Sequence, residues 1–199
     1  MPLLNIFPLD EGRPSPGVVR PLQLADLPAV MEIQRLCYGD AYVEGRALFA
    51  RRLASPANCS LVALHGDAVV AYLAAYWSVV GKVTPLHGDF EACPQPDTLY
   101  LHDMAVHPAQ AGQGLARRLL ASLWQQAARR GMRYSALVSV QGSQDYWCRQ
   151  GYSVHALQNP LQQQCLESYG SEAVYMLRAF SGDGAVSAGG ESGDNAGYA

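Results

Sequence analysis

The stretch from Thr98 to Arg130 decides the fold, and it reads "TLYLHDMAVHPAQAGQGLARRLLASLWQQAARR". Its first nine residues are mostly apolar or aromatic, which predicts a β-strand that ends at His107–Pro108. Its last half places apolar residues on one helical face, which predicts an amphipathic helix. Between the two elements lies a turn of glycine and small residues that contains no acidic side chain.

The turn "AGQGLA", from Ala111 to Ala116, is suited to bind an anion. Glycine lets backbone N–H groups approach a ligand closely, and the free N–H groups and dipole of a helix N-terminus favour negative charge. The sequence therefore predicts a cradle for a phosphate or pyrophosphate, with Arg117 and Arg118 at its rim. The alternative is a glycine-containing loop before an ordinary helix. The dinucleotide spacing G-x-G-x-x-G fails, because Arg117 stands where the third glycine would be.

Strands and helices alternate along the chain, and two early strands flank a tight turn at "HGD". This order predicts a single α/β domain with a mixed, mostly antiparallel sheet and helices on both faces. The domain is expected over residues 18–180, after an irregular N-terminal arm (1–17) and before a disordered Gly/Ser/Ala-rich tail (181–199). Strands are predicted at 18–23, 59–64, 68–80, 98–106, 134–140 and 172–180, and helices at 24–37, 44–56, 115–130 and 143–150.

The composition excludes several function classes. Of the 17 acidic residues, 3 lie in the tail, which leaves 14 acidic against 14 basic residues in the rest of the chain. A neutral body favours neither nucleic acid nor an anionic membrane as partner. The five cysteines include no C-x-x-C, so neither a disulfide framework nor a metal site is expected, and a cytoplasmic location fits best. The longest apolar run is too short for a membrane helix.

The strand, the turn, the helix and a later "YWCRQGY" together resemble the core of the GNAT acetyltransferase superfamily. The pyrophosphate motif of that family is Arg or Gln, two residues of any type, Gly, any residue, then Gly or Ala. Gly114 and Ala116 match its last two anchors, whereas Ala111 stands at the first anchor and Gln110 one residue earlier. The aromatic ending of the family is matched by Tyr146, Trp147, Gly151 and Tyr152.

The resemblance implies acetyl-CoA as cosubstrate. The backbone at the end of the strand would pair with the pantetheine arm, the turn would hold the pyrophosphate, and residues 143–147 would line the other side. The cofactor-binding residues implied in this way are Met104, Ala105, Val106, Ala111, Gly112, Gln113, Gly114, Leu115, Ala116, Arg117, Ser143 and Trp147.

Acetyl transfer to an amine needs a base, because an alkylammonium with a pKa of ~10.4 has no lone pair at neutral pH. His102 is the candidate base. Its strand resembles that of serotonin N-acetyltransferase-like enzymes, in which two histidines two residues apart deprotonate the amine. His102 matches the second, and Tyr100 stands at the position of the first. The alternative is a histidine that fills the sheet surface.

Asp103 is the competing base. Regular strand alternation predicts Tyr100, His102, Met104 and Val106 on one face, and Leu101, Asp103 and Ala105 on the other. Both bases could then not easily face one substrate. The alternative for Asp103 is a hydrogen bond to a neighbouring loop.

The leaving thiolate needs a proton, and Tyr146 is the candidate acid. In this register the family's tyrosine position falls on Trp147, and one helical residue is a rotation of about 100°. The alternatives are a core aromatic at Tyr146 and protonation by another group or by water. Asp40, Tyr42 and Glu44 lie in a link that in this family borders the acceptor site. An acid there could receive an ammonium, and the alternative is a solvated loop.

The expected function is acetyl transfer from acetyl-CoA to a primary amine of a small molecule, because no basic or extended acidic docking tract is apparent. A protein or peptide N-acetyltransferase is the alternative among enzymes. A non-catalytic acyl-CoA-binding module is the alternative from another class. Homodimer formation stays open.

Overall fold

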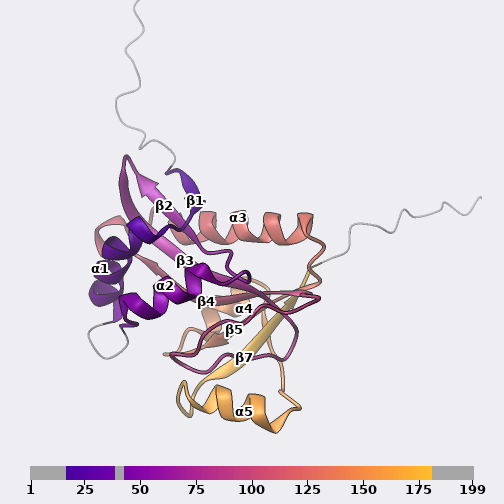
Figure 1. The fold of residues 1–199 in the computed structure, drawn as a ribbon. Coiled ribbons are helices and arrows are strands. Elements are labelled where there is room, and N and C mark those ends of the chain that lie inside the picture. Colours follow the sequence, from indigo (N-terminus) through magenta and orange to yellow (C-terminus); the bar gives the residue numbers. More distant parts are fainter. Residues whose placement is uncertain (1–16, 39–42, 181–199) are drawn as a thin grey trace, which may run out of the picture.

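The computed structural model describes residues 17–38 and 43–180, and these form one open sheet flanked by helices (Figure 1). Seven strands follow the order β1-β2-β3-β4-β5-β7-β6. The strands are β1 (Val19–Pro21), β2 (Leu61–His65), β3 (Ala68–Ser78), β4 (Thr98–Val106), β5 (Tyr134–Ser139), β6 (Ser153–Val154) and β7 (Val174–Ala179). The α-helices are α1 (Leu27–Tyr38), α2 (Arg46–Ala54), α3 (Leu115–Arg129), α4 (Gln144–Arg149) and α5 (Pro160–Glu167).

The sheet is mixed and mostly antiparallel, as predicted. Among the described strands only β4 and β5 pair in parallel, and α3 makes the crossover between them. β2 and β3 form the predicted hairpin around Gly66, whose φ of 59° is the left-handed conformation that glycine adopts without strain.

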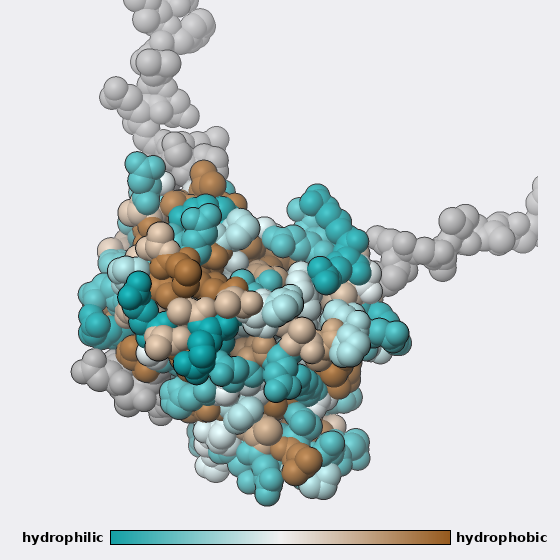
Figure 2. Space-filling model, viewed as in Figure 1, coloured by the Kyte–Doolittle hydropathy of each residue, from teal (hydrophilic) through white to brown (hydrophobic). Residues whose placement is uncertain are grey.

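Each face of the sheet carries its own core. On one face, the apolar stripe of α3 packs with Trp147 of α4 over strand residues such as Leu99 and Leu101. On the other face, α1 and Phe49 of α2 pack over Tyr72, Tyr76 and Tyr100. The predicted placement of helices on both faces is therefore confirmed. In the view of Figure 2, hydrophobic residues reach the surface in small separate groups among hydrophilic ones.

Two elements were missed by the sequence analysis. α5 and the short strand β6 lie within residues 153–167, for which no element is predicted above. Asn159 caps α5 by accepting a hydrogen bond from the Leu161 N–H at 2.9 Å, and Pro160 opens the helix. The predicted arm (apart from Gly17) and tail lie outside the described residues. No helix of 17–38 or 43–180 is long and apolar enough to span a bilayer.

Candidate active site

The ladder between β4 and β5 covers only the first part of β4. Residues 98–101 pair with residues 134–137, although β4 continues to Val106 and β5 to Ser139. Beyond Leu101, β4 stays paired with β3 and β5 with β7, so the two strands separate. Within the described chain, the main chain of residues 102–106 therefore has N–H and C=O groups without a ladder partner on the β5 side.

A β-bulge lies where this separation begins. Ala74 pairs with Asp103 and the next residue, Ala75, pairs with Leu101, so His102 is an extra residue in β4. The bulge resets the alternation of side chains. His102 and Asp103 both contact residues on the α1 side of the sheet, whereas Met104 and Val106 pack into the α3 core.

The predicted assignment of β4 side chains to faces is therefore wrong beyond His102. Tyr100, His102, Asp103 and Ala105 share the α1 side, and Leu101, Met104 and Val106 share the α3 side. The conclusion that His102 and Asp103 could not both face one substrate does not hold. A bulge arises from the pairing of β4 with β3, and a strict alternation of side chains along β4 has no place for the extra residue.

The turn before α3 has the open geometry expected of an anion cradle. Gly112 and Gly114 have φ of 79° and 72°, and a Cβ built on either would meet nothing within 4 Å. α3 begins at Leu115, and no side chain caps its first N–H groups. Residues 112–114 are exposed, and the main-chain donors of the turn open there, whereas the Ala111 N–H already donates to the Pro108 carbonyl at 3.1 Å. Gln113 lies between the two glycines, and Ala116 follows in the first turn of α3.

Gln110, one residue before the first anchor of the motif, contacts the end of β2. Its Oε1 lies 3.1 Å from His65 Nδ1, at the end of β2. Ala111 carries only a methyl group, so in the described structure the turn relies on main-chain donors. The arginines that follow, Arg117 and Arg118, are the cations nearest in sequence.

Residues 143–147 lie beyond the other strand of the opening. Ser143 Oγ lies 3.0 Å from Ser139 Oγ at the end of β5 and donates to the Val140 carbonyl at 2.7 Å. Trp147 is buried in the α3 core. Tyr146 is half-buried with its ring edge-on to Trp147, and burial raises the pKa of its hydroxyl.

His102 belongs to a buried cluster of side chains from distant segments. Its Nε2 lies 3.1 Å from Glu44 Oε2 and 2.8 Å from Arg52 Nη1. Arg52 also donates to both carboxylate oxygens of Glu44, at 2.6 and 2.9 Å, and from Nε to the Gly88 carbonyl at 2.9 Å. Phe90 covers the ring of His102 at 5.0 Å between centroids. Only 4% of the His102 side chain and none of the Arg52 side chain is exposed.

The neighbouring groups of this cluster keep Glu44 ionised at neutral pH. Burial would raise the pKa of Glu44, but the hydrogen bonds and charges of His102 and Arg52 outweigh it and lower the pKa to about 2. The interpretation of Glu44 as part of a solvated loop is therefore wrong. Asp40 and Tyr42 lie outside the described residues. Across those residues, no group of three or more His, Cys, Asp and Glu gathers to hold a metal ion.

Asp103 is held by two tyrosines on the same side of the sheet. Tyr38 donates to Oδ1 at 2.8 Å, and the Tyr72 hydroxyl donates to Oδ2. Burial raises the pKa of Asp103, although the Tyr72 hydrogen bond opposes the rise. The alternative predicted for Asp103 was a hydrogen bond to a neighbouring loop. Its partners instead lie in α1 and β3.

The long loop 79–97 covers this side of the sheet by joining α2 to α5. On the α2 side, Gly88 and Phe90 accept hydrogen bonds from Arg52 and Ser55, and Asp89 pairs with Arg51 at 3.2 Å. On the α5 side, the loop bonds Gln162, Ser168 and Tyr169 through Val83, Leu86 and Thr84.

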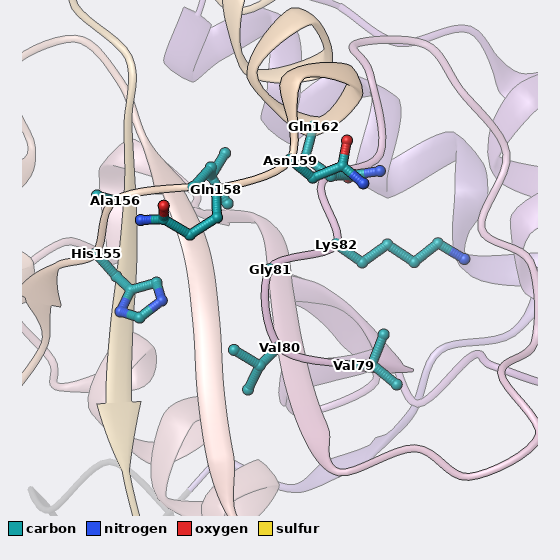
Figure 3. Close-up of a pocket in the computed structure, with 10 residues that line it drawn as sticks. Val79, Val80, Gly81, Lys82, His155, Ala156, Gln158, Asn159 and Gln162 are labelled. Atoms are coloured by element: carbon teal, nitrogen blue, oxygen red, sulfur yellow. The ribbon is translucent and has the colours of Figure 1, made fainter.

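A cavity of about 480 Å³ lies under the start of this loop (Figure 3). It is lined by residues 79–82 of the loop and by residues of the segment from His155 to Gln162. Tyr175 connects the two walls, because its hydroxyl accepts from the Gly81 N–H at 3.0 Å and its ring contacts His155. Figure 3 shows the Lys82 side chain directed away from His155 and Gln158. The cavity is therefore separate from the turn before α3.

Comparison with known proteins identifies a family and solved structures that are similar to this chain. Residues 27–152 match the model of the acetyltransferase (GNAT) family. No curated protein matches the chain. Among solved structures, the ribosomal-protein-S18-alanine N-acetyltransferase of Escherichia coli has a TM-score of 0.60 at 17% identity, covering 84% of this chain and 97% of that one.

Two further structures were solved with coenzyme A. The PaiA N-acetyltransferase of Thermoplasma acidophilum has a TM-score of 0.58 at 11% identity, over 82% of this chain and 99% of that one. The N-acetylglutamate synthase of Neisseria gonorrhoeae has a TM-score of 0.62 at 14% identity, over 84% of this chain and 36% of that one. At these identities the likeness concerns the fold.

Proposed function

This chain belongs to the acetyltransferase (GNAT) family, with acetyl-CoA as cosubstrate, and from that premise we propose that it acetylates the primary amine of a small molecule. One observation carries the proposal. The segment of β4 that has no β5 partner leads into the open turn before α3 at one end, and at the other it places His102 and Asp103 together on the α1 side.

The β4 main chain that lacks a β5 partner fits the pantetheine arm of acetyl-CoA, and the turn before α3 fits its pyrophosphate. Main-chain N–H and C=O groups of Met104, Ala105 and Val106 would pair with the amides of the pantetheine arm, where the Met104 and Val106 carbonyls already accept from Tyr38 at 2.9 Å and Cys37 at 3.3 Å. Main-chain donors from Gly112 to Arg117 would hold the pyrophosphate, because nothing within 4 Å blocks Gly112 or Gly114. Ser143 and Trp147 would border the opposite strand. The acyl end of the cosubstrate would then lie near the bulge.

In the proposed reaction His102 accepts one proton from the substrate ammonium. The freed nitrogen lone pair forms the C–N bond with the thioester carbonyl carbon, the C–S bond breaks, and the thiolate of CoA leaves while the nitrogen gives its second proton to water. Tyr146 is the proposed proton donor to that thiolate, and its phenolate then recovers a proton from water. Asp103 is the second candidate base, and its two tyrosine partners already occupy both carboxylate oxygens.

The covering loop supports a small acceptor. Loop 79–97 is bonded to α2 at one end and to the α5 segment at the other, across the side of the sheet that carries His102. An extended polypeptide would have to displace this loop to reach His102. A protein acceptor stays the alternative, since a structural neighbour is named for acetylation of a ribosomal protein. The strand resemblance described above adds arylalkylamines to the classes to be tested.

An acceptor screen tests the proposal. The full chain is incubated with acetyl-CoA and single alkylamines, arylalkylamines or peptides, with thiol release and acceptor mass as readouts. We expect small primary amines to be acetylated faster than peptide N-termini or lysine side chains. Faster peptide acetylation would assign a protein substrate, and acetyl-CoA binding without any transfer would assign a non-catalytic module.

The cosubstrate site has its own test. Acetyl-CoA should raise the melting temperature, because a ligand that binds only the folded state stabilises it. Gly114→Glu should abolish this rise by placing bulk and negative charge against the pyrophosphate. Gly114→Ala is the matched control, because it introduces the same backbone strain at φ 72° without the charge. Equal acetyl-CoA binding by both variants would remove the turn from the site.

A further inference from the structure

Glu44 supplies the one carboxylate of the described chain within hydrogen-bond distance of the His102 ring. The position of Glu44 is fixed from two directions. Its N–H donates to Gln34 Oε1 of α1 at 2.8 Å, and its carboxylate is gripped by both terminal nitrogens of Arg52. Its side chain is 5% exposed. Because Glu44 is buried and hydrogen-bonded on both sides, its carboxylate is held in one position beside the His102 imidazole.

Two groups compete for the same nitrogen of His102. If Nε2 carries a hydrogen, it donates to Glu44 Oε2 and leaves the lone pair on Nδ1. If Nε2 carries none, it accepts from Arg52 Nη1 and the hydrogen is on Nδ1. Only the first arrangement leaves the ring with a basic nitrogen that is not already engaged in the cluster.

We propose that Glu44 is a positioning residue, which accepts the Nε2–H of His102 and so holds the ring in the tautomer whose Nδ1 can take the substrate proton. This inference rests on the proposed function, in which His102 is the base. Arg52 is the competing partner, because Nη1 carries two hydrogens: one is donated to Glu44 Oε2 at 2.6 Å, and the other can reach Nε2 at 2.8 Å. Charge distinguishes the two arrangements once the ring takes up the substrate proton.

Charge supports the same assignment. Arg52 is always protonated, so an imidazolium that formed beside it without a carboxylate would place two positive charges together in a buried site. With Glu44 present, the imidazolium gains a charge-assisted hydrogen bond. The other titratable or charged groups that face the pair are His87, Asp103, Tyr72, Tyr76 and Tyr169.

The first test reads the tautomer directly. ¹⁵N NMR of the full chain with labelled histidine distinguishes protonated from unprotonated ring nitrogens, and the resonances that disappear in His102→Gln identify His102. We expect Nε2 to be protonated and Nδ1 to be free at a pH above the titration of the ring. A spectrum with the hydrogen on Nδ1 would overturn the proposal, whatever the acceptor proves to be.

The second test uses Glu44→Gln and Glu44→Asp in the acetylation assay. Glu44→Gln should lower kcat by about 10²-fold while the affinity for acetyl-CoA stays unchanged, and the acid limb of its pH–rate profile should move to lower pH. Glu44→Asp keeps the carboxylate and should recover part of the rate. A profile that does not move in Glu44→Gln would overturn the positioning role. Absence of transfer in the wild-type chain would instead contradict the proposed function, and the NMR result would still decide the tautomer.

Discussion

The turn before α3 and the cluster around His102 lie at the two ends of the same β4 segment, the one that lacks a β5 partner, yet they are built in opposite ways. The turn uses consecutive residues, main-chain donors and an exposed surface. The cluster uses side chains from the link before α2, from the last turn of α2, from loop 79–97 and from β4, and it is buried. A substitution in the turn should therefore act on cosubstrate binding, whereas one in the cluster should act on chemistry and on folding together.

The difference also concerns how each part tolerates change. Main-chain donors survive most side-chain substitutions, provided that the backbone keeps its conformation. A buried ion pair loses far more when one partner is removed, because the other charge is left without compensation.

His102→Gln should lower turnover at neutral pH by about 10²–10⁴-fold, because it removes the proposed base. The affinity for acetyl-CoA should change little, since the side chain lies on the α1 side and the cradle is made of main chain. The defect should shrink as the pH approaches ~10.4, where more of the amine is already deprotonated. Steady-state kinetics against pH and calorimetric titration measure both effects. A loss confined to Asp103→Asn would transfer the role of base to Asp103.

Arg52→Met should lower the free energy of unfolding by about 3–5 kcal/mol, because it leaves the buried carboxylate of Glu44 without its partner. Arg51→Met is the matched control, since Arg51 is the neighbouring arginine and its pair with Asp89 is more than half exposed. That control should stay within about 1 kcal/mol of the wild type. Urea denaturation compares the three proteins, and equal stabilities would show that the cluster is not held by its ion pair.

Stability should depend on pH through Glu44. The pKa of Glu44 in the folded protein is about 2, below the ordinary value of 4.5. Its contribution to the free energy of unfolding is therefore complete above pH 4.5 and is lost as the pH falls toward 2. The shift corresponds to about 3 kcal/mol. Unfolding free energies of wild type and Glu44→Gln should therefore converge by about this amount between pH 6 and pH 2. Parallel curves would contradict the lowered pKa.

Gly112→Ala should cost about 1 kcal/mol of stability, because an alanine at φ 79° adopts the left-handed conformation although its Cβ has room. Gly45→Ala provides the control, as Gly45 also has an open Cβ position but a φ of −67°. Gly112→Ala should therefore have a lower melting temperature than Gly45→Ala. A larger loss for Gly45→Ala would mean that the strain of the turn is relieved elsewhere.

The fold and the cosubstrate turn could be predicted because their information is local. The hairpin around Gly66 and the amphipathic α3 are each contained in a short run of sequence, and Gly114 and Ala116 lie within one motif. The cluster could not be predicted in the same way. His102 was singled out, but neither its contact with Arg52 nor the burial of Glu44 is written in any nearby pattern.

The bulge at His102 marks the limit of reasoning from periodicity. Strict alternation assigned His102 and Asp103 to opposite faces, and pairing with β3 placed them on one. α5 was missed for another reason. Its start carried a readable signal in Asn159–Pro160, but no buried residue of this helix gives it a strong apolar stripe.

The short ladder between β4 and β5 has a mechanical consequence. The sheet consists of two half-sheets, β1 to β4 and β5 to β6, joined side by side along residues 98–101 and 134–137. A seam so short is the natural axis for a twisting motion of one half against the other. A cosubstrate that bonded both margins of the opening would lengthen that seam and stiffen the domain. Amide hydrogen exchange would then slow on loading in β5 and also in β7, which does not border the opening.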